Sequence, residues 1–337
     1  MHCLEAGTPG KPCVLLLHGF PELAYSWRKV MPALAEAGFH VIAPDQRGYG
    51  ATTGWHASYD GDLAPFRVLN LVEDAVALLS RLGIKRAHVV GHDFGSPVAA
   101  HCALTRPDVF RSVVLMSAPF GGAPIGGRSS KVLDELAAMG RKHYQWYYST
   151  READDNMRRA PQGVHAFLRA YYHYKSADWP GNKPFALKGW IASELAKMPT
   201  YYIMERDKGM AETVAPYLPA REAPWLTDAE LAIYAEAFES NGFQGGLQWY
   251  RAATSAQYAA ELSAATAGKT IDIPAMYIAG ASDWGVHQKP GEFERMQTAM
   301  CADFRGAHLI AGAGHWVQQE QPQKTATLLL DFLRAAG

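Results

Sequence analysis

Gly91-His92-Asp93-Phe94-Gly95 lies between an apolar run expected to form a strand and a run expected to open a helix. Glycines at both ends permit the sharp turn of a nucleophile elbow, which holds its central side chain above the carboxyl end of a sheet. This turn usually carries serine at its centre, but here it carries Asp93. An aspartate is already an anion at neutral pH and needs no base. The motif predicts a carboxylate that attacks carbon, or, more simply, an aspartate that caps the helix.

Short apolar runs alternate with helical patterns along both ends of the chain. Residues 68–82 repeat apolar side chains with a period near 3.6 and end at Gly83, which predicts a helix. Strands are predicted at 13–17, 39–43, 87–90, 112–116, 275–279 and 307–310. This alternation predicts an α/β fold with a mostly parallel sheet and helices on both faces.

The middle of the chain breaks this alternation. Residues 120–268 contain no convincing strand and are rich in Tyr, Trp and Met in helical segments. One helix is expected to open at Thr227, because Glu230 follows three residues later as in a capping box. The strand pattern resumes near Ile271. We therefore expect a helical cap at 120–268, inserted into a core formed by 1–119 and 269–337.

Composition excludes several classes of protein. The 337 residues are 48% hydrophobic, and 32 Lys and Arg balance 33 Asp and Glu, so no basic excess draws the chain to nucleic acid or an anionic membrane. The four cysteines form no close pair, so neither a disulfide framework nor a zinc site is predicted. No apolar run is long enough to insert in a membrane. The default expectation is a soluble, cytoplasmic protein, and its oligomeric state is left open.

A second motif, His18-Gly19-Phe20-Pro21-Glu22, directly follows the apolar strand. A loop at the carboxyl end of that strand can point the backbone N–H of Phe20 into the site. Together with the N–H of Phe94 it would form an oxyanion hole. Taken alone, the motif favours an ordinary turn that leaves a strand.

The third element is a base with an orienting acid. His315 lies in a glycine-rich turn after the last predicted strand, and Asp283 follows the strand before it. A catalytic imidazole needs a carboxylate on its other ring nitrogen. The chain order Asp93, Asp283, His315 is the order of nucleophile, acid and histidine expected for an α/β-hydrolase. The rival position for the acid, residues 117–119, holds Ser-Ala-Pro and no carboxylate.

These motifs together resemble the epoxide hydrolases of the α/β-hydrolase superfamily. The resemblance rests on Asp93, the segment 18–22, the turn Asp-Gln-Arg-Gly-Tyr-Gly at 45–50 and the pair Gly314-His315, and it spans nearly the whole chain. It implies the α/β-hydrolase fold. One departure is at the start, where only residues 1–6 precede the turn at 7–11, although the family usually has two strands there.

The resemblance also implies two cap tyrosines that hydrogen-bond the epoxide oxygen. Gln248-Trp249-Tyr250-Arg251 matches the second tyrosine segment, so Tyr250 is expected in that role. In His-Tyr-Gln-Trp-Tyr-Tyr at 143–148, Tyr144 lies four residues before an aromatic, as in the first segment. Tyr147 and Tyr148 stay open as alternatives, and any of these rings could simply pack in an aromatic-rich cap.

The implied reaction has two steps and takes a small apolar epoxide and water as its partners. Asp93 attacks an epoxide carbon while Tyr144 and Tyr250 hydrogen-bond the oxygen, and water activated by His315 then hydrolyses the ester to a vicinal diol. Asp283 orients His315. Neither step requires a metal or an organic cofactor.

Rival functions remain open on the same fold. A haloalkane dehalogenase shares the aspartate nucleophile, but its halide donors, typically a Trp after the nucleophile and an Asn or Glu after His-Gly, are replaced by Phe94 and Phe20. A fluoroacetate-type dehalogenase would have arginines after the nucleophile, where Phe94 and Pro97 stand. A non-catalytic small-molecule receptor would not need a nucleophile, an acid and a base together.

Overall fold

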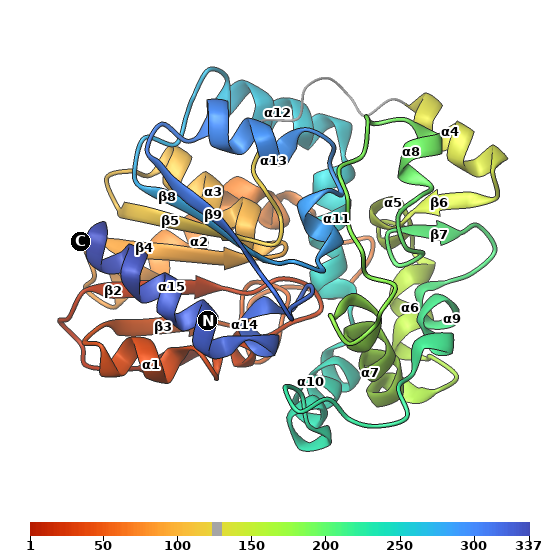
Figure 1. The fold of residues 1–337 in the computed structure, drawn as a ribbon, viewed down its shortest axis with the longest axis horizontal. Coiled ribbons are helices and arrows are strands. Elements are labelled where there is room, and N and C mark those ends of the chain that lie inside the picture. Colours follow the sequence, from red (N-terminus) through yellow and green to blue (C-terminus); the bar gives the residue numbers. More distant parts are fainter. Residues whose placement is uncertain (123–129) are drawn as a thin grey trace.

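A seven-stranded sheet forms the centre of the molecule (Figure 1). The computed structural model describes residues 1–122 and 130–337; residues 123–129, part of the predicted cap, lie outside the described residues. The strand order is β1-β3-β2-β4-β5-β8-β9, and every neighbouring pair is parallel except β1 and β3. The strands are β1 (Cys3–Ala6), β2 (Cys13–Leu17), β3 (His40–Pro44), β4 (Ala87–His92), β5 (Phe110–Met116), β8 (Ala275–Gly280) and β9 (Phe304–Ile310). The predicted mostly parallel sheet is confirmed.

The degree to which each strand is buried explains how well its bounds could be predicted from the sequence. All residues of β2, β3 and β4 are buried, as in a parallel strand covered on both faces, and such strands have continuous apolar runs. β9 is an edge strand that is only partly buried, and it begins three residues before the predicted start. One strand, β1, precedes β2 and forms the opposite edge of the sheet.

Helices cover both faces of the sheet. Apolar side chains of α1 (Met31–Glu36) and α15 (Pro322–Ala335) pack on one face, with Val14 and Leu16 of β2. Those of α2 (Val68–Arg81) and α3 (Gly95–Thr105) pack on the other, with Leu15 and Leu17. The remaining helical elements near the sheet are η1 (Ala24–Trp27), η2 (Ala64–Phe66), η4 (Trp284–Val286), α13 (Glu292–Arg295), η5 (Met296–Met300) and α14 (Val317–Glu320).

The elements between β5 and β8 lie mostly to one side of the sheet, at the right of Figure 1. They are α4 (Ser130–Ala138), α5 (Tyr144–Tyr148), α6 (Glu152–Arg158), α7 (Gly163–Lys175), α8 (Ala192–Leu195), α9 (Met210–Val214), η3 (Ala215–Tyr217), α10 (Asp228–Asn241), α11 (Gln244–Thr254) and α12 (Ala256–Thr266). The predicted capping box of Thr227 and Glu230 opens α10. The domain boundaries at 119 and 268 stay a prediction.

The expectation that residues 120–268 contain no strand is wrong. β6 (Arg141–His143) and β7 (Ile203–Glu205) form a small antiparallel sheet. Each has three residues, and β6 is polar throughout, so neither shows an apolar run or a useful alternation. Their pairing joins segments some sixty residues apart, which local patterns do not reveal.

Helix α11 connects the two parts of the molecule. It contacts α5 and α6 of the predicted cap and α2 beside the sheet. Tyr250 lies on this helix and is thereby placed where cap and core meet. No helix within the two described ranges is both long and apolar enough to span a membrane.

Candidate active site

The turn between β4 and α3 has the backbone that its glycines suggested. Asp93 has a φ of 51°, in the left-handed region that non-glycine residues seldom adopt. A Cβ on Gly91 would lie 2.1 Å from the carbonyl oxygen of Gly95, and one on Gly19 would lie 2.4 Å from the Cβ of Asp93. Only glycine therefore allows this strand, turn and loop to pack so closely around Asp93.

Both carboxylate oxygens of Asp93 face groups that the sequence had singled out. Oδ1 accepts a hydrogen bond from the backbone N–H of Phe20 at 3.0 Å, and Oδ2 lies 3.3 Å from Nε2 of His315. Among the described residues, no backbone N–H of the first turn of α3 donates to this side chain, and the N-cap residue of α3 is Phe94. Within the described residues, the N–H of Phe94 makes no hydrogen bond to this carboxylate. Of the two expected oxyanion donors, the N–H of Phe20 therefore contacts Asp93 and that of Phe94 does not.

His315 and Asp283 lie at the carboxyl ends of β9 and β8. Nδ1 of His315 is 3.1 Å from Oδ1 of Asp283, and that oxygen also accepts the backbone N–H of Gly285 at 2.7 Å. Nε2 lacks a well-aligned hydrogen bond to any described residue, although it faces Asp93. The structure thus brings Asp93, His315 and Asp283 together in the predicted order of contacts.

Electrostatics keep both acids ionised. Burial acts to raise the pKa of Asp93, but His315, Lys175 and His92 outweigh it and hold that pKa well below its usual range. Burial likewise opposes ionisation of Asp283, and His315 lowers the pKa of Asp283 below its ordinary value. A nucleophile and an orienting acid both need the carboxylate form.

Sequence reasoning missed Lys175, a buried lysine at the end of α7. Its ammonium lies 5.2 to 5.8 Å from the ring centres of Tyr171, Tyr201, Tyr202 and Trp316. Burial lowers the pKa of Lys175, against the opposing field of Asp93, Asp283 and Glu22. Its carbonyl oxygen accepts the backbone N–H of His315 at 3.0 Å. Nothing in its sequence context distinguished it from a surface lysine at a helix end.

A buried ion pair, Glu22 with His92, lies next to Asp93. Oε2 of Glu22 accepts the backbone N–H of Gly19 at 3.1 Å and lies 2.6 Å from Nδ1 of His92. Nε2 of His92 donates to the carbonyl oxygen of His315 at 2.7 Å. Burial disfavours charge on both groups, but Glu22 raises the pKa of His92 and His92 lowers that of Glu22. The pair joins the loop of Phe20, the elbow and the turn of His315.

Glu320 fixes the turn of His315 from its other side. Its two carboxyl oxygens accept the backbone N–H groups of Ala177 at 2.8 Å, Gly314 at 2.9 Å and Trp316 at 3.0 Å. Burial raises the pKa of Glu320 to about 8, although these three N–H groups act to lower it. Ala177 belongs to the segment after α7, so one side chain ties this segment to both neighbours of His315.

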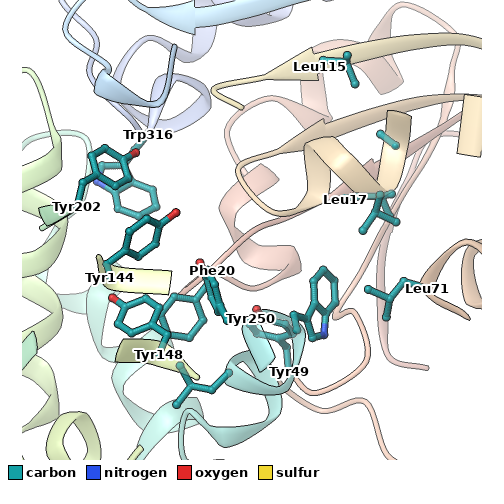
Figure 2. Packing of buried hydrophobic residues seen from close by; sticks show 14 of the residues in the cluster. Leu17, Phe20, Tyr49, Leu71, Leu115, Tyr144, Tyr148, Tyr202, Tyr250 and Trp316 are labelled. Carbon is teal, nitrogen blue, oxygen red and sulfur yellow. The ribbon is translucent and has the colours of Figure 1, made fainter. Parts of the chain in front are cut away.

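Tyr144 and Tyr250 lie together in an aromatic cluster with Phe20 and Tyr148 (Figure 2). The centres of the Tyr144 and Tyr250 rings are 5.9 Å apart, and both side chains are buried. The hydroxyl of Tyr144 donates to Oε1 of Gln288 at 3.1 Å. Within the described residues, the hydroxyl of Tyr250 makes no hydrogen bond. Burial, reinforced by the charge of Asp93, raises the pKa of Tyr250 well above its usual value, so its phenol is neutral and can donate.

The two alternative tyrosines differ in position. The Tyr148 ring is 5.0 Å from that of Tyr250, but its hydroxyl donates to the hydroxyl of Tyr171 at 3.3 Å. Tyr147 packs against Lys142, whose ammonium is 4.4 Å from the ring centre. Tyr147 makes no ring contact with Tyr250, whereas Tyr144 and Tyr148 both do. Tyr144 and Tyr148 are therefore the two candidates for the first cap tyrosine.

A cavity of about 350 Å³ lies beside this site, between residues 186–189 and 286–294. None of its lining residues is a predicted site residue. His287 and Lys289 line it, and Gln288 between them reaches Tyr144 instead. The segment 286–291 therefore contacts both the cavity and Tyr144.

Known proteins match this chain over nearly its whole length. The sequence model of the alpha/beta hydrolase fold matches residues 12–322. Epoxide hydrolase B of Mycobacterium tuberculosis is 36% identical, with 99% of this chain and 95% of that protein covered. Epoxide hydrolase A of the same species is 34% identical, with 99% and 94% covered. A solved structure, an epoxide hydrolase from an endophytic Streptomyces, has a TM-score of 0.81 and 32% identity, with 99% and 92% covered. With the fold and the aspartate elbow, these matches show that the chain belongs to the epoxide hydrolases of the α/β-hydrolase fold family.

Proposed function

We propose that this hydrolase converts an epoxide to a vicinal diol through a covalent ester on Asp93. The observation that carries the proposal is the carboxylate at the elbow, with Oδ1 on the N–H of Phe20 and Oδ2 facing Nε2 of His315. Oδ1 is held in a place suited to negative charge, and Oδ2 accepts no well-aligned hydrogen bond from a described residue, which leaves it available for attack.

In the first step, Oδ2 of Asp93 forms a bond to an epoxide carbon as the bond from that carbon to the ring oxygen breaks. Tyr250 and Tyr144 hydrogen-bond the ring oxygen, and one phenol proton passes to it as negative charge develops. The neutral phenol of Tyr250, whose pKa is raised by burial, suits this donor role. The product is a hydroxyalkyl ester and a tyrosinate.

In the second step, Nε2 of His315 takes a proton from water, whose oxygen attacks the ester carbonyl carbon of Asp93. The N–H groups of Phe20 and Phe94 hold the oxyanion on Oδ1. The bond between Cγ and Oδ2 then breaks as the proton on His315 passes to the departing alkoxide, so the diol leaves with Oδ2. The second proton of the water, left on the new carboxyl group of Asp93, passes to the tyrosinate, so that Asp93 is again a carboxylate and the tyrosine is again neutral. Asp283 stabilises the imidazolium through Nδ1.

The side chains around the nucleophile suit a small apolar epoxide. Phe20, Phe94, Tyr144, Tyr148 and Tyr250 make ring contacts with one another beside Asp93. Phe20 and Phe94 replace the polar halide donors of a haloalkane dehalogenase, which favours the epoxide over a halide. The cytoplasmic location expected from composition stays a prediction.

A single-turnover experiment in 18O-water tests the proposal. With enzyme in excess over styrene oxide, the first diol should carry unlabelled oxygen from Asp93, and the label should enter the peptide that contains Asp93. Mass spectrometry of both products measures this. Label in the first diol and none in the peptide would overturn the covalent route.

A further inference from the structure

Ser117, at the end of β5, is the second residue with an unusual backbone. Among the described non-glycine residues, only Asp93 and Ser117 have positive φ, at 51° and 68°. These two residues follow neighbouring strands, β4 and β5, at the same edge of the sheet. Such conformations persist only where the surroundings hold them, and they gather at functional sites.

Two hydrogen bonds fix the backbone of Ser117, one through its N–H group and one through its carbonyl oxygen. Its backbone N–H donates to the carbonyl oxygen of Ile278 at 3.1 Å, and its own carbonyl oxygen accepts the hydroxyl of Tyr277 at 2.7 Å. Both partners lie on β8, the strand that leads to Asp283. The left-handed turn is therefore fastened to the strand that carries the acid.

This turn places the serine hydroxyl on the catalytic imidazole. Oγ of Ser117 is completely buried and lies 2.9 Å from Nδ1 of His315. The same nitrogen is 3.1 Å from Oδ1 of Asp283, so Nδ1 has two oxygen partners. An N–H on Nδ1 can be shared between these acceptors, and the proton then cannot reside on Nε2 of a neutral ring. The hydroxyl also helps to keep the pKa of Asp283 low.

We propose that Ser117 is a positioning residue for His315, which acts with Asp283 to keep the Nδ1–H tautomer and so leaves Nε2 as the base. This inference rests on the proposed function, because it assigns a partner to the base of the second step. Asp93 attacks without a base, so the loss of the hydroxyl should slow ester hydrolysis and spare ester formation.

The chain contains a matched control. Ser112, also buried on β5, lies 2.7 Å through Oγ from Nδ1 of His88. His88 is at the amino end of β4, away from the site. S112A thus removes the same kind of bond, serine Oγ to histidine Nδ1, from the strand that leads to Ser117. A purely structural role for Ser117 predicts equal behaviour of S112A and S117A.

The first test measures both steps by stopped flow and rapid quench with styrene oxide. S117A should form the ester at the wild-type rate and hydrolyse it about fivefold to tenfold more slowly, the effect of one lost hydrogen bond. S112A should change neither step. S117G, which suits a left-handed backbone, should repeat the S117A result if S117A folds poorly. Wild-type hydrolysis in S117A and S117G, or equal slowing of both steps, would overturn the inference.

The second test moves the acid to position 117. Aspartate tolerates a left-handed backbone, and its carboxylate would meet the nitrogen that Oγ now meets. D283N/S117D should therefore hydrolyse the ester at least tenfold faster than D283N. If the double variant hydrolyses the ester no faster than D283N, the contact between residue 117 and Nδ1 of His315 is contradicted. Intact-mass measurement separates the two proposals, because a wild-type enzyme that forms no ester contradicts the proposed function itself.

Discussion

Glu22 and His92 form a hydrogen-bonded ion pair, 2.6 Å between Oε2 and Nδ1, in which both side chains are completely buried. Both ring nitrogens of His92 face acceptors, Glu22 on one side and the carbonyl oxygen of His315 on the other. The backbone next to Asp93, the loop of Phe20 and the turn of His315 are thus all linked to this one buried pair of charges.

Glu22→Gln should destabilise the protein strongly. It leaves a buried imidazole without its counter-charge, and loss of one member of such a pair costs about 3–5 kcal/mol. Thermal unfolding followed by circular dichroism measures the loss. Glu261→Gln is the control, because Glu261 forms an exposed ion pair with Arg67, and such exposed pairs contribute little to stability. Equal melting temperatures for the two variants would contradict the importance of the buried pair.

Tyr250→Phe should slow ester formation on the order of 100-fold, the usual size of an acid-catalytic contribution, and leave ester hydrolysis nearly unchanged. The reason is that the phenol acts on the epoxide oxygen, not on water. Single-turnover kinetics separate the two steps. Tyr147→Phe is the control, because that ring packs against Lys142. Unchanged alkylation in Tyr250→Phe would remove Tyr250 from the mechanism.

His315→Gln should trap the ester. Asp93 needs no base to attack, whereas water does, so hydrolysis should fall on the order of 10²- to 10⁴-fold while alkylation continues. Intact-mass spectrometry after substrate addition should show the enzyme plus one substrate. An unmodified mass together with lost turnover would mean that His315 acts before the ester forms.

The rate of alkylation should stay constant as the pH rises through 10. The pKa of Tyr250 lies well above its ordinary value of 10.0 because of burial and the nearby charge of Asp93, so the phenol keeps its proton in this range. A group with a raised pKa loses its proton only at higher pH, so the alkaline limb should move upward. Rapid-quench rates from pH 7 to 10.5 test this. A fall with a midpoint near or below 10, absent in Tyr250→Phe, would contradict it.

Glu320→Gln should slow ester hydrolysis and lower the free energy of unfolding by about 1–3 kcal/mol. An amide presents an NH₂ group where one of the two carboxyl oxygens now accepts a backbone N–H group beside His315. Chemical denaturation and single-turnover hydrolysis measure the two effects. If both match the wild type, the contacts of Glu320 do not position the histidine turn.

The sequence alone determined the buried strands, the elbow and the edge of the sheet at which the site residues meet. Buried parallel strands need continuous apolar residues, so β2 and β4 were predictable, and the elbow needs glycine around Asp93 because a Cβ would collide there. Residues at the carboxyl ends of strands meet at one edge of a parallel sheet, so the approach of Asp93, Asp283 and His315 also followed from the sequence.

Only the tertiary structure decided the partners that come from distant segments without a local pattern. In the sequence, Ser117 is notable only because its position lacks a carboxylate. In the structure, a left-handed turn that is hydrogen-bonded to β8 places its hydroxyl next to Nδ1 of His315. No local pattern marks Lys175 in the sequence, but the packing of α7 buries it among aromatic rings and in the field of three carboxylates. The pairing of β6 with β7 likewise depends on segments far apart in the chain. In each case the arrangement is stabilised by contacts between segments that are far apart in the chain. The residues next to each position in the sequence therefore do not encode it.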